Sequence, residues 1–369
     1  MIYLDHGATS YPKPAEVHWA MMDAMDRCAN PGRGGYPAAM KGARVVFECR
    51  KRTAQLFDCD PEQVVFTSNC TQGLNMAIRT LFKPGDRVVI SGFEHNAVTR
   101  PLYGMGCKTV VAGRKLFDWE DTLNEFGEAL DSGVDGAVFT HVSNVFGYIL
   151  PVAEMAKMCR EKGIPFVIDA AQSAGHMGVS LKNLGADFIA MPGHKGLLGP
   201  MGTGLLLCGR LPEPLIMGGT GSESRNQQMP DFLPDRGEAG TLNVPGIAGL
   251  CAGIGYLQGI GIEKIEKMEQ NLAKKTAYGL KELGFQVFSG PHQGGTLSFL
   301  TRMDCEEGAR ILARDGIAVR AGLHCAPLAH ESAGTIETGT VRVSFGMDAD
   351  PVQAEAFLRA ASKLRAADF

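Results

Sequence analysis

The segment "MPGHKGLLGPMGTG" (191–204) sets His194 and Lys195 among glycines and prolines, directly after an apolar run. A lysine in this setting is either a solvated loop charge or a reactive amine. A reactive amine forms a Schiff base with an aldehyde, which is one form of covalent catalysis. Glycines let the backbone bring such an amine close to a ligand. The other polar residues of the chain have to decide between the two interpretations.

Polar side chains also follow the other apolar runs of this half of the chain. In open parallel sheets, ligands bind beyond the carboxyl ends of the strands. One polar strand end is ordinary, but several in succession predict a shared site. The runs cover 63–68, 87–91, 136–142, 165–171 and 187–191, and the candidates at their ends are Cys70, Thr71, His95, Asn144, Asp169, Gln172, His194 and Lys195.

The residue types indicate one particular chemistry only when they are taken together. "NCTQG" (69–73) opens a helical pattern, and free N–H groups at a helix N-terminus hold phosphate, although a plain N-cap explains this motif when it stands alone. Asp169, His95 and Lys195, each taken alone, are equally ordinary as a loop cap, a structural histidine and a solvated charge. No G-x-G-x-x-G or P-loop pattern indicates a nucleotide. A phosphate cup, a Schiff-base lysine and an aspartate for a pyridine nitrogen together predict a pyridoxal phosphate (PLP) site.

The elements that position these residues follow from the hydropathy pattern. Apolar strands, with a last one at 202–208, alternate with amphipathic stretches, which favours a mostly parallel sheet covered on both faces. A glycine-rich segment, 217–246, is expected to be a long functional loop. Helical patterns over 246–283, 304–315 and 351–366, with strands at 295–300 and 317–320, predict a second, smaller α/β domain. We expect a large domain over 13–245 and a small domain made of 1–12 and 246–369.

Composition excludes several classes of partner. The 369 residues are 45% hydrophobic and 21% charged with a net charge of −4, so neither a nucleic-acid nor a membrane partner is predicted. No apolar run approaches the ~20 residues of a membrane span, and no signal peptide is recognised, so we expect a cytoplasmic protein. The ten cysteines form no CxxC pair, which argues against a zinc ribbon and leaves most of them as core thiols.

Motifs distributed over nearly the whole chain carry a resemblance. They are "YLDHGATSYPKP" (3–14), "NCTQGLNMA", "EHNAV", "VSNVFG", "VIDAAQSAG", "PGHKGLLGPMGTG", "EAGTLN" (238–243), "VRAGLHCAPL" (319–328) and "TVRVSFG" (340–346). In order and spacing the chain resembles PLP-dependent enzymes of fold type I, class V aminotransferase group, in the cysteine desulfurase and selenocysteine lyase branch. The resemblance implies an α/β fold with a mostly parallel seven-stranded sheet in the large domain and a smaller C-terminal α/β domain.

The resemblance implies roles around the cofactor ring. Lys195 matches the lysine that forms the Schiff base and moves the α-proton, and Asp169 matches the partner of the ring nitrogen. Gln172 matches the donor to the phenolic oxygen, and His95 matches the residue that stacks on the ring and serves in proton transfer. Asn144 matches a contact of the cofactor oxygen and of the substrate carboxylate side.

The resemblance also implies the phosphate and substrate sites. Cys70 through its backbone, Thr71 and His194 match the phosphate cup. Thr241 matches a threonine that reaches the phosphate of the other subunit, which implies a homodimer with shared active sites. Arg342 matches the arginine that binds the α-carboxylate of an amino-acid substrate.

Cys325 distinguishes the reactions of this branch. It matches a nucleophilic cysteine whose thiolate takes the substrate sulfur as a persulfide, releases alanine and passes the sulfur to an acceptor protein. His324 beside it is expected to favour the thiolate. The alternative for Cys325 is one more core thiol, while a metal site with His324 and His330 lacks a fourth ligand nearby.

Some positions depart from the pattern of the family. Pro192 stands where relatives carry a serine hydroxyl, so phosphate binding is expected to depend more on Thr71, His194 and backbone N–H groups. His6 stands where Asn or Ser is common, which is expected to bear on substrate choice. Arg33 falls in a loop that lines the site in relatives, and the segment 217–236 has no clear counterpart.

Four functions are consistent with these residues. The first is a cysteine desulfurase, and the second is a selenocysteine lyase with the same chemistry. The third is a class V aminotransferase or epimerase that uses Lys195 and Asp169 without Cys325. The fourth is a cofactor-binding scaffold without catalysis, against which the intact Lys195, Asp169 and Arg342 argue.

Overall fold

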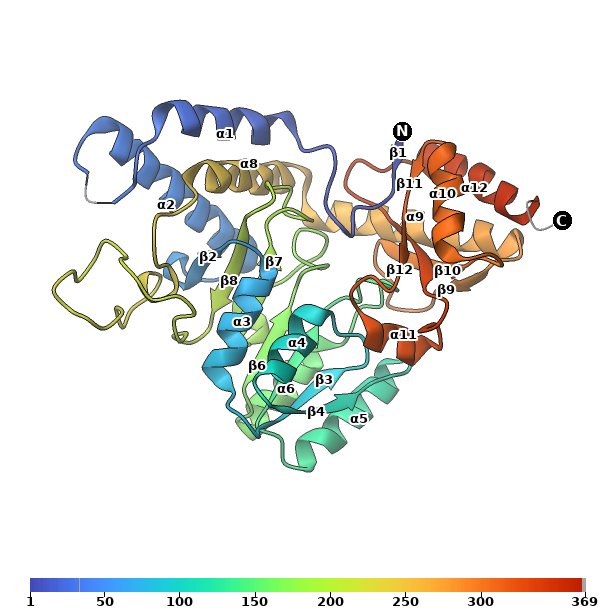
Figure 1. The fold of residues 1–369 in the computed structure, drawn as a ribbon, viewed down its shortest axis with the longest axis horizontal. Helices are drawn as coiled ribbons and strands as arrows, with labels where there is room; N and C mark the ends of the chain where they lie inside the picture. The colour runs from blue at the N-terminus through green and yellow to red at the C-terminus, as the bar shows by residue number, and fades with distance from the viewer. Residues whose placement is uncertain (33, 367–369) are drawn as a thin grey trace.

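The computed structural model describes residues 1–32 and 34–366, so Arg33 lies outside the described residues. In the described part of the chain the main element is a seven-stranded sheet in the order β2-β8-β7-β6-β5-β3-β4 (Figure 1). Its strands are parallel except β8, which runs antiparallel to both neighbours. The predicted mostly parallel seven-stranded sheet is confirmed. The strand bounds are β2 (Val64–Thr67), β3 (Arg87–Ser91), β4 (Lys108–Ala112), β5 (Gly136–Thr140), β6 (Phe166–Asp169), β7 (Phe188–Pro192) and β8 (Gly204–Cys208).

The predicted apolar runs form the central strands because both faces of the sheet are covered. All residues of β5, β6, β7 and β8 are buried, as a continuous apolar run requires in a doubly covered sheet. The sequence did not reveal β4, which lies at the edge of the sheet and begins with two exposed residues, Lys108 and Thr109.

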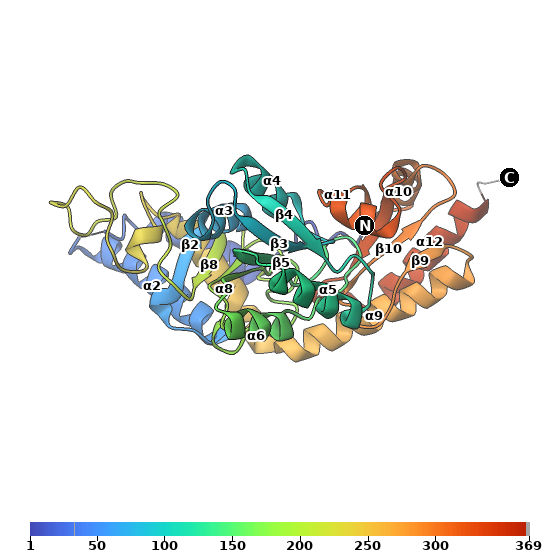
Figure 2. The same cartoon turned by 90° about the horizontal axis from the view of Figure 1, so that it is seen from below.

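Helices cover the two faces of the sheet. The helices α3 (Cys70–Leu81) and α4 (Asn96–Gly104) lie on one face, and α5 (Trp119–Asp131) and α6 (Val152–Lys162) lie on the other (Figure 2). The short α7 (Leu181–Leu184) precedes β7. At one end, α1 (Ala15–Arg27) and α2 (Pro37–Phe57) pack against α8 (Val244–Ile260). Residues 209–243, between β8 and α8, form a long segment that contains only a short 3-10 helix, η2 (Asp235–Gly237), among its described elements.

A second unit contains a four-stranded antiparallel sheet in the order β12-β13-β10-β9. The strand β1 also belongs to this unit, because it pairs in parallel with β11. The first strand and the last helix of the chain thus both lie here (Figure 1). The side chains of α9, α10 and α12 share its core. The bounds are β1 (Ile2–Tyr3), α9 (Ile262–Glu282), β9 (Gln286–Phe288), β10 (Thr296–Leu300), α10 (Cys305–Arg314), β11 (Ile317–Ala318), β12 (Arg320–Gly322), α11 (Pro327–Ala333), β13 (Thr340–Ser344) and α12 (Pro351–Ala366).

The boundary between the two units stays a proposal. The division into 13–245 and 1–12 with 246–369 assigns α8 to the small domain, yet Ile247, Leu250 and Ile254 of α8 belong to the core of the large sheet. We therefore propose that the small domain resumes after α8, near Gly261. Among described residues no single helix is long and apolar enough to cross a membrane; only α8 and α9 together pass that test, and they meet at an angle of 79°.

Candidate active site

The loop after β7 brings Lys195 close to the sheet because glycines remove the side chains that would obstruct it. A Cβ at Gly193 would lie 2.2 Å from Oγ1 of Thr203, and one at Gly196 would lie 2.3 Å from the carbonyl oxygen of Ala174. Real Cβ atoms are not found at such distances. The glycines on either side of the His-Lys pair therefore allow a close backbone approach, as the sequence predicts.

A cavity of about 170 Å³ lies at the carboxyl ends of β5, β6 and β7. The structure brings most of the predicted cofactor residues together here. The cavity is lined by Asn69, Cys70, Thr71, His95, Ala97, Thr140, Asn144, Asp169, Ala171, Gln172, Pro192, His194 and Lys195. Because carboxyl ends of parallel strands meet at one edge of a sheet, residues spread over more than 120 positions converge there.

The Lys195 amine lies in an environment that disfavours its charged form. Burial and, next, the positive charge of Arg342 lower the pKa of Lys195, while Asp169 acts in the opposite direction. Lys195 forms no ion pair with any carboxylate of the described residues. A desolvated lysine without a close counter-ion has more of its free amine at neutral pH, which is the form that attacks an aldehyde.

Asp169 presents a buried carboxylate to the same cavity. Its side chain is almost fully buried, and Oδ1 accepts hydrogen bonds from the Ala171 N–H at 2.9 Å and from Sγ of Cys70 at 3.5 Å. No described residue donates to Oδ2. One oxygen is thus fixed by the protein, and the other is left for a donor within the cavity.

The backbone sets the tautomer of His95. This residue caps α4, and its Nδ1 accepts a hydrogen bond from the Ala97 N–H at 3.0 Å. The proton of the neutral ring must therefore be on Nε2. Burial lowers the pKa of His95, which keeps the ring neutral. The turn before it is held by the buried Glu94, whose Oε1 accepts from the Thr140 N–H at 2.8 Å.

The first turn of α3 offers free backbone donors. Asn69 caps the helix by accepting from the Gln72 N–H at 2.9 Å, while the N–H groups of Cys70 and Thr71 have no acceptor among the described residues. Both residues line the cavity. Unpaired N–H groups at a helix N-terminus form a site for an anion such as phosphate.

His194 lines the same cavity as this donor group. The Thr9 hydroxyl donates to the carbonyl oxygen of His194 at 3.0 Å, so Nδ1 of His194, 3.1 Å from the same Oγ1, must be the donor there. Nε2 of His194 is then unprotonated in the neutral ring. Burial, followed by the charges of Lys195 and Lys13, lowers the pKa of His194 to about 4. Nζ of Lys13 donates to the carbonyl oxygen of His194 at 2.6 Å, and burial lowers the pKa of Lys13 to about 8.

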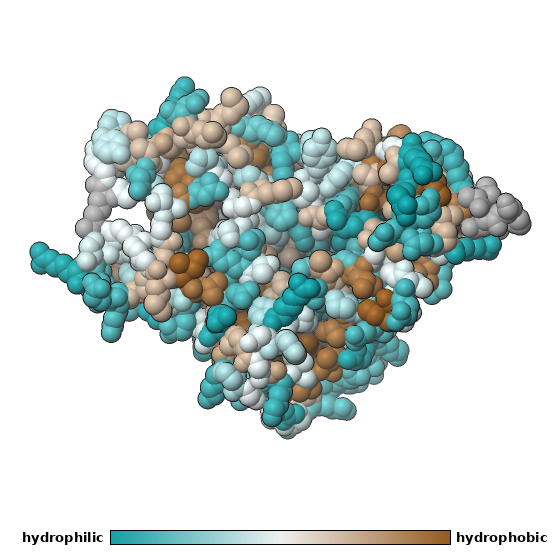
Figure 3. Space-filling model, viewed as in Figure 1, coloured by the Kyte–Doolittle hydropathy of each residue, from teal (hydrophilic) through white to brown (hydrophobic). Residues whose placement is uncertain are grey.

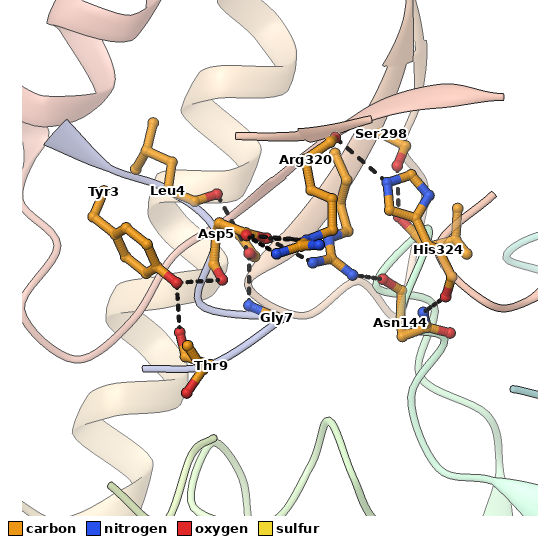
Figure 4. A network of polar contacts seen from close by, with 12 residues as sticks. Tyr3, Leu4, Asp5, Gly7, Thr9, Asn144, Ser298, Arg320 and His324 are labelled. Carbon is orange, nitrogen blue, oxygen red and sulfur yellow. Dashed lines mark hydrogen bonds and ion pairs between the residues drawn. The ribbon is translucent and has the colours of Figure 1, made fainter. Parts of the chain in front are cut away.

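Two arginines converge on the carboxylate of Asp5, and Figure 4 shows the contact that Arg320 makes with it. Nη2 of Arg342 donates to Oδ1 of Asp5 at 2.8 Å, and Nη1 donates to the backbone carbonyl of Asn144 at 2.9 Å. Arg320 holds the same carboxylate through Nε at 3.0 Å and Nη2 at 2.8 Å. The Nε of Arg342 is buried without a partner among the described residues, so this guanidinium retains donor capacity.

The loop that carries Cys325 is fastened to the walls of the cavity. The Asn96 N–H donates to the carbonyl of Cys325 at 2.8 Å, and Nδ2 of Asn144 donates to the carbonyl of His324 at 2.8 Å (Figure 4). His324 and Cys325 both have left-handed backbone conformations, with φ of 51° and 55°. Cys325 is exposed, unlike a core thiol. The backbone of the loop is thus hydrogen-bonded beside His95, the neighbour of Asn96, although neither Cys325 nor Arg342 is among the residues that line the cavity.

The structure does not support the expectation that His324 favours a Cys325 thiolate by its charge. Burial, followed by the positive charge of Arg342, lowers the pKa of His324 to about 3, so the ring is neutral at physiological pH. A neutral imidazole carries no charge with which to stabilise a thiolate.

Comparison with protein families decides the affiliation of the chain. The family model described as aminotransferase class-V matches residues 2–357. The chain belongs to the aminotransferase class-V family. Two relatives named "probable cysteine desulfurase" support this: the protein of Methanothermobacter thermautotrophicus is 35% identical and that of Pyrococcus abyssi 36% identical. The alignments cover 93% and 97% of this chain and 89% and 92% of the relatives.

Solved structures agree with this family and with the predicted fold. The apo structure of a cysteine desulfurase from Thermococcus onnurineus superposes with a TM-score of 0.90 at 34% identity, covering 98% of this chain and 94% of that one. The S-sulfonic acid form of the cysteine desulfurase CsdA from Escherichia coli gives 0.86 at 26% identity, covering 99% and 95%. The fold-type-I α/β architecture expected of the class V family is thereby confirmed.

Some of the expected site residues lie elsewhere in this class V chain. Thr241 does not line the cavity of Lys195; it lines two neighbouring hollows, one with Thr67 and one with Phe47. His6 does not line the cavity of Lys195 either. It is buried, and its Nε2 lies 3.5 Å from Oδ1 of Asp348. Pro192 lines the cavity and offers no donor, as predicted. Nε2 of Gln172 already donates to the carbonyl of Gly7 at 2.9 Å and keeps one further N–H.

Sequence reasoning did not identify Asp5, Glu94, Lys13 or Arg320. Each stands within or next to a motif that was recognised: Asp5 and Lys13 in "YLDHGATSYPKP", Glu94 in "EHNAV" and Arg320 in "VRAGLHCAPL". Their signal is a charged residue within an otherwise apolar or small-residue motif. Charge alone does not distinguish a buried partner from a solvated side chain, and so these four residues needed the structure.

Proposed function

We propose that the protein is a cysteine desulfurase, which converts L-cysteine to L-alanine and carries the sulfur as a persulfide on Cys325. The observation that carries the proposal is the convergence of Lys195, Asp169 and His95 on one cavity. The Cys325 loop is hydrogen-bonded to Asn144 on the wall of this cavity and to Asn96, the neighbour of His95. The curated relatives and the solved structures named above as cysteine desulfurases support the same reaction.

The residues of the cavity fit PLP. Lys195 would bind its aldehyde, Oδ2 of Asp169 its ring nitrogen, and the free N–H groups of Cys70 and Thr71 its phosphate. His95 and Gln172, on the cavity wall, would contact the ring and its phenolic oxygen. When bound, the cofactor supplies an electron sink that acidifies the α-carbon of an amino acid.

The chain's own residues would then perform the reaction. Arg342 would hold the substrate carboxylate with its unpaired Nε–H and remaining N–H groups, and the Lys195 amine would move the α-proton. The Cys325 thiolate would attack the substrate sulfur. A new S–S bond forms, the substrate C–S bond breaks, and its electron pair stays with the three-carbon fragment. That fragment takes up a proton from Lys195 or His95 and leaves as alanine.

A homodimer with shared active sites is part of this proposal. The helix α1 exposes Trp19, Met22 and Met25, whose exposed fractions are 66%, 63% and 70%, and Figure 3 shows apolar surface over this helix. Exposed apolar residues that gather on one face indicate a protein interface. A hollow of about 550 Å³ beside α2 is lined by Phe47 and Thr241. We propose that the partner subunit covers this face and that Thr241 reaches the partner's phosphate cup.

The test is alanine release from L-cysteine by the purified, PLP-loaded protein. Without a thiol reductant we expect about one alanine per active site, since the persulfide on Cys325 has no acceptor; with dithiothreitol, turnover should be repeated. Cys325→Ala should abolish alanine formation and keep the visible absorbance of the cofactor. The matched control is Cys107→Ala, which removes a half-buried cysteine outside the cavity.

Other outcomes would replace the proposed reaction. Alanine from L-selenocysteine alone would identify a selenocysteine lyase. Amino-group exchange with a keto acid that persists in Cys325→Ala would identify an aminotransferase, because that reaction needs no thiol. Sulfur transfer to a protein acceptor is tested with radiolabelled cysteine, where label that never leaves Cys325 would contradict an acceptor role.

A further inference from the structure

Behind the Cys325 loop lies a row of polar side chains that the proposed reaction does not use. His330, in α11, is fully buried, and its Nδ1 lies 2.8 Å from Oγ1 of Thr335. Its Nε2 lies 3.4 Å from Nδ1 of His324, and the two imidazole rings are nearly parallel, 12° apart. The Nε2 of His324 lies 3.4 Å from the carbonyl oxygen of Arg320 (Figure 4). Three side chains thus connect α11 to the backbone just before Cys325.

The carbonyl at one end of this row determines which atom donates at every step. The Arg320 carbonyl only accepts, so Nε2 of His324 must carry the proton. Nδ1 of neutral His324 is then unprotonated and accepts a hydrogen bond from Nε2–H of His330. Because Nε2 of His330 carries the proton, Nδ1 of the same ring is unprotonated and accepts a hydrogen bond from the Thr335 hydroxyl. Burial lowers the pKa values of His324 and His330 to about 3 and 4, which agrees with two neutral rings.

The hydrogen-bonded row formed by Thr335, His330 and His324 adjoins a strained part of the backbone, residues 324–325. Left-handed conformations are unfavourable for residues other than glycine, and His324 and Cys325 adopt them consecutively. Their carbonyl groups are held by Asn144 and Asn96 on the cavity side. The His324 ring is held from the other side by His330, whose neighbour Phe146 packs against it with ring centroids 5.9 Å apart.

Resting on the proposed function, we propose that His330 is a positioning residue for the nucleophile. Fixed by Thr335, it donates a hydrogen bond to His324 and so holds the two left-handed residues of the loop that carries the Cys325 thiol. His330 is not among the residues that line the cavity. It acts through His324 alone.

The experiment compares three variants in the PLP-loaded protein. His330→Leu removes the donor, and His330→Gln places an amide N–H near the position of Nε2. Thr335→Val removes the hydroxyl that fixes the ring. His292→Leu, at an exposed histidine between β9 and β10 that does not line the cavity, is the control. The measurements are the rate and half-saturating concentration of single-turnover alanine formation, and the histidine tautomers from ¹⁵N NMR of histidine-labelled protein.

We expect His330→Leu to slow alanine formation on the order of 10- to 100-fold at saturating L-cysteine, because a displaced thiol loses its attack geometry. The half-saturating concentration should stay near the wild-type value, since Arg342 is unchanged. His330→Gln should recover most of the rate, Thr335→Val should fall between the two, and both rings of the wild type should show the Nε2–H form.

Several results would overturn the proposal. These are a wild-type rate in His330→Leu, a Gln variant no faster than the Leu variant, or an Nδ1–H or charged form of either ring. If His330→Leu fails to fold, His330→Gln and Thr335→Val decide: the proposal is contradicted if both keep the wild-type rate and Thr335→Val keeps the wild-type tautomer. Failure of the proposed function can be told apart from failure of this proposal. In that case the wild type itself forms no alanine from L-cysteine, while the NMR spectrum still shows the tautomers of His324 and His330.

Discussion

Asp5 accepts a hydrogen bond of 2.8 Å from Nη2 of Arg342, a residue 337 positions further along the chain. Both groups are buried, and the carboxylate is shared with Arg320. The segment that follows the first strand, β1, thereby orients the guanidinium that we propose for the substrate carboxylate. A buried arginine without this partner would be an uncompensated charge.

Removing this carboxylate should therefore be costly. We expect Asp5→Ala to lower the free energy of unfolding by roughly 3 kcal/mol, the usual scale for breaking one side of a buried ion pair. Urea unfolding followed by circular dichroism measures it. The control is Glu307→Ala, which breaks the solvent-accessible pair with Arg310 and should cost far less. Equal effects in the two variants would contradict a structural role for the buried pair.

Glu94 should make stability depend on pH. Burial raises the pKa of Glu94 from 4.5 to about 8. Between pH 4.5 and about pH 8 the folded protein keeps a proton on Glu94 that the unfolded chain has lost. The contribution of Glu94 to the free energy of unfolding is therefore complete at low pH, and it falls by about 1.4 kcal/mol per pH unit as the pH rises through this range. Glu94→Gln holds no such proton. Its unfolding free energy should fall less than that of the wild type between pH 5 and pH 8, and parallel pH profiles would contradict this.

Binding of the cofactor phosphate should take up a proton at His194. The pKa of His194 is about 4, so the ring is neutral and its unprotonated Nε2 can only accept a hydrogen bond. An ionised phosphate oxygen also accepts, so the two atoms cannot form a hydrogen bond until Nε2 is protonated. A bound phosphate raises this pKa and makes Nε2 a donor, so affinity should fall as pH rises. Calorimetry of PLP binding to the apo protein, in buffers of different ionisation enthalpy, counts the protons. In His194→Gln the uptake should disappear; the same uptake in both proteins would assign it to another group.

The close packing around Lys195 should make Gly196 irreplaceable. A Cβ at this position would meet the Ala174 carbonyl and the His176 ring, so we expect Gly196→Ala to destabilise the protein by about 1–3 kcal/mol and to displace Lys195. Reduced PLP absorbance and an earlier thermal transition would report both effects. Gly259→Ala in α8 is the matched control, because a Cβ there meets no atom within 4 Å. Normal cofactor loading in Gly196→Ala would contradict the close approach.

The sequence by itself determined the sheet and most of the cavity. Buried strands read as apolar runs, and the polar residue after each run must lie at one edge when the strands are parallel, so Lys195, Asp169, His95 and Asn144 could be grouped before any coordinates. The edge strand β4 escaped this reasoning because it is half exposed and its pattern is weaker.

Only the tertiary structure decided the charge states and the long-range partners. His324 reads as a possible cation beside Cys325, but burial next to Arg342 keeps it neutral. Asp5 and Arg342 come from opposite ends of the chain, and nothing local relates them. Local patterns determine elements because periodicity is local, whereas a pKa or an ion pair depends on which groups the fold brings within a few ångströms and on how much water it excludes.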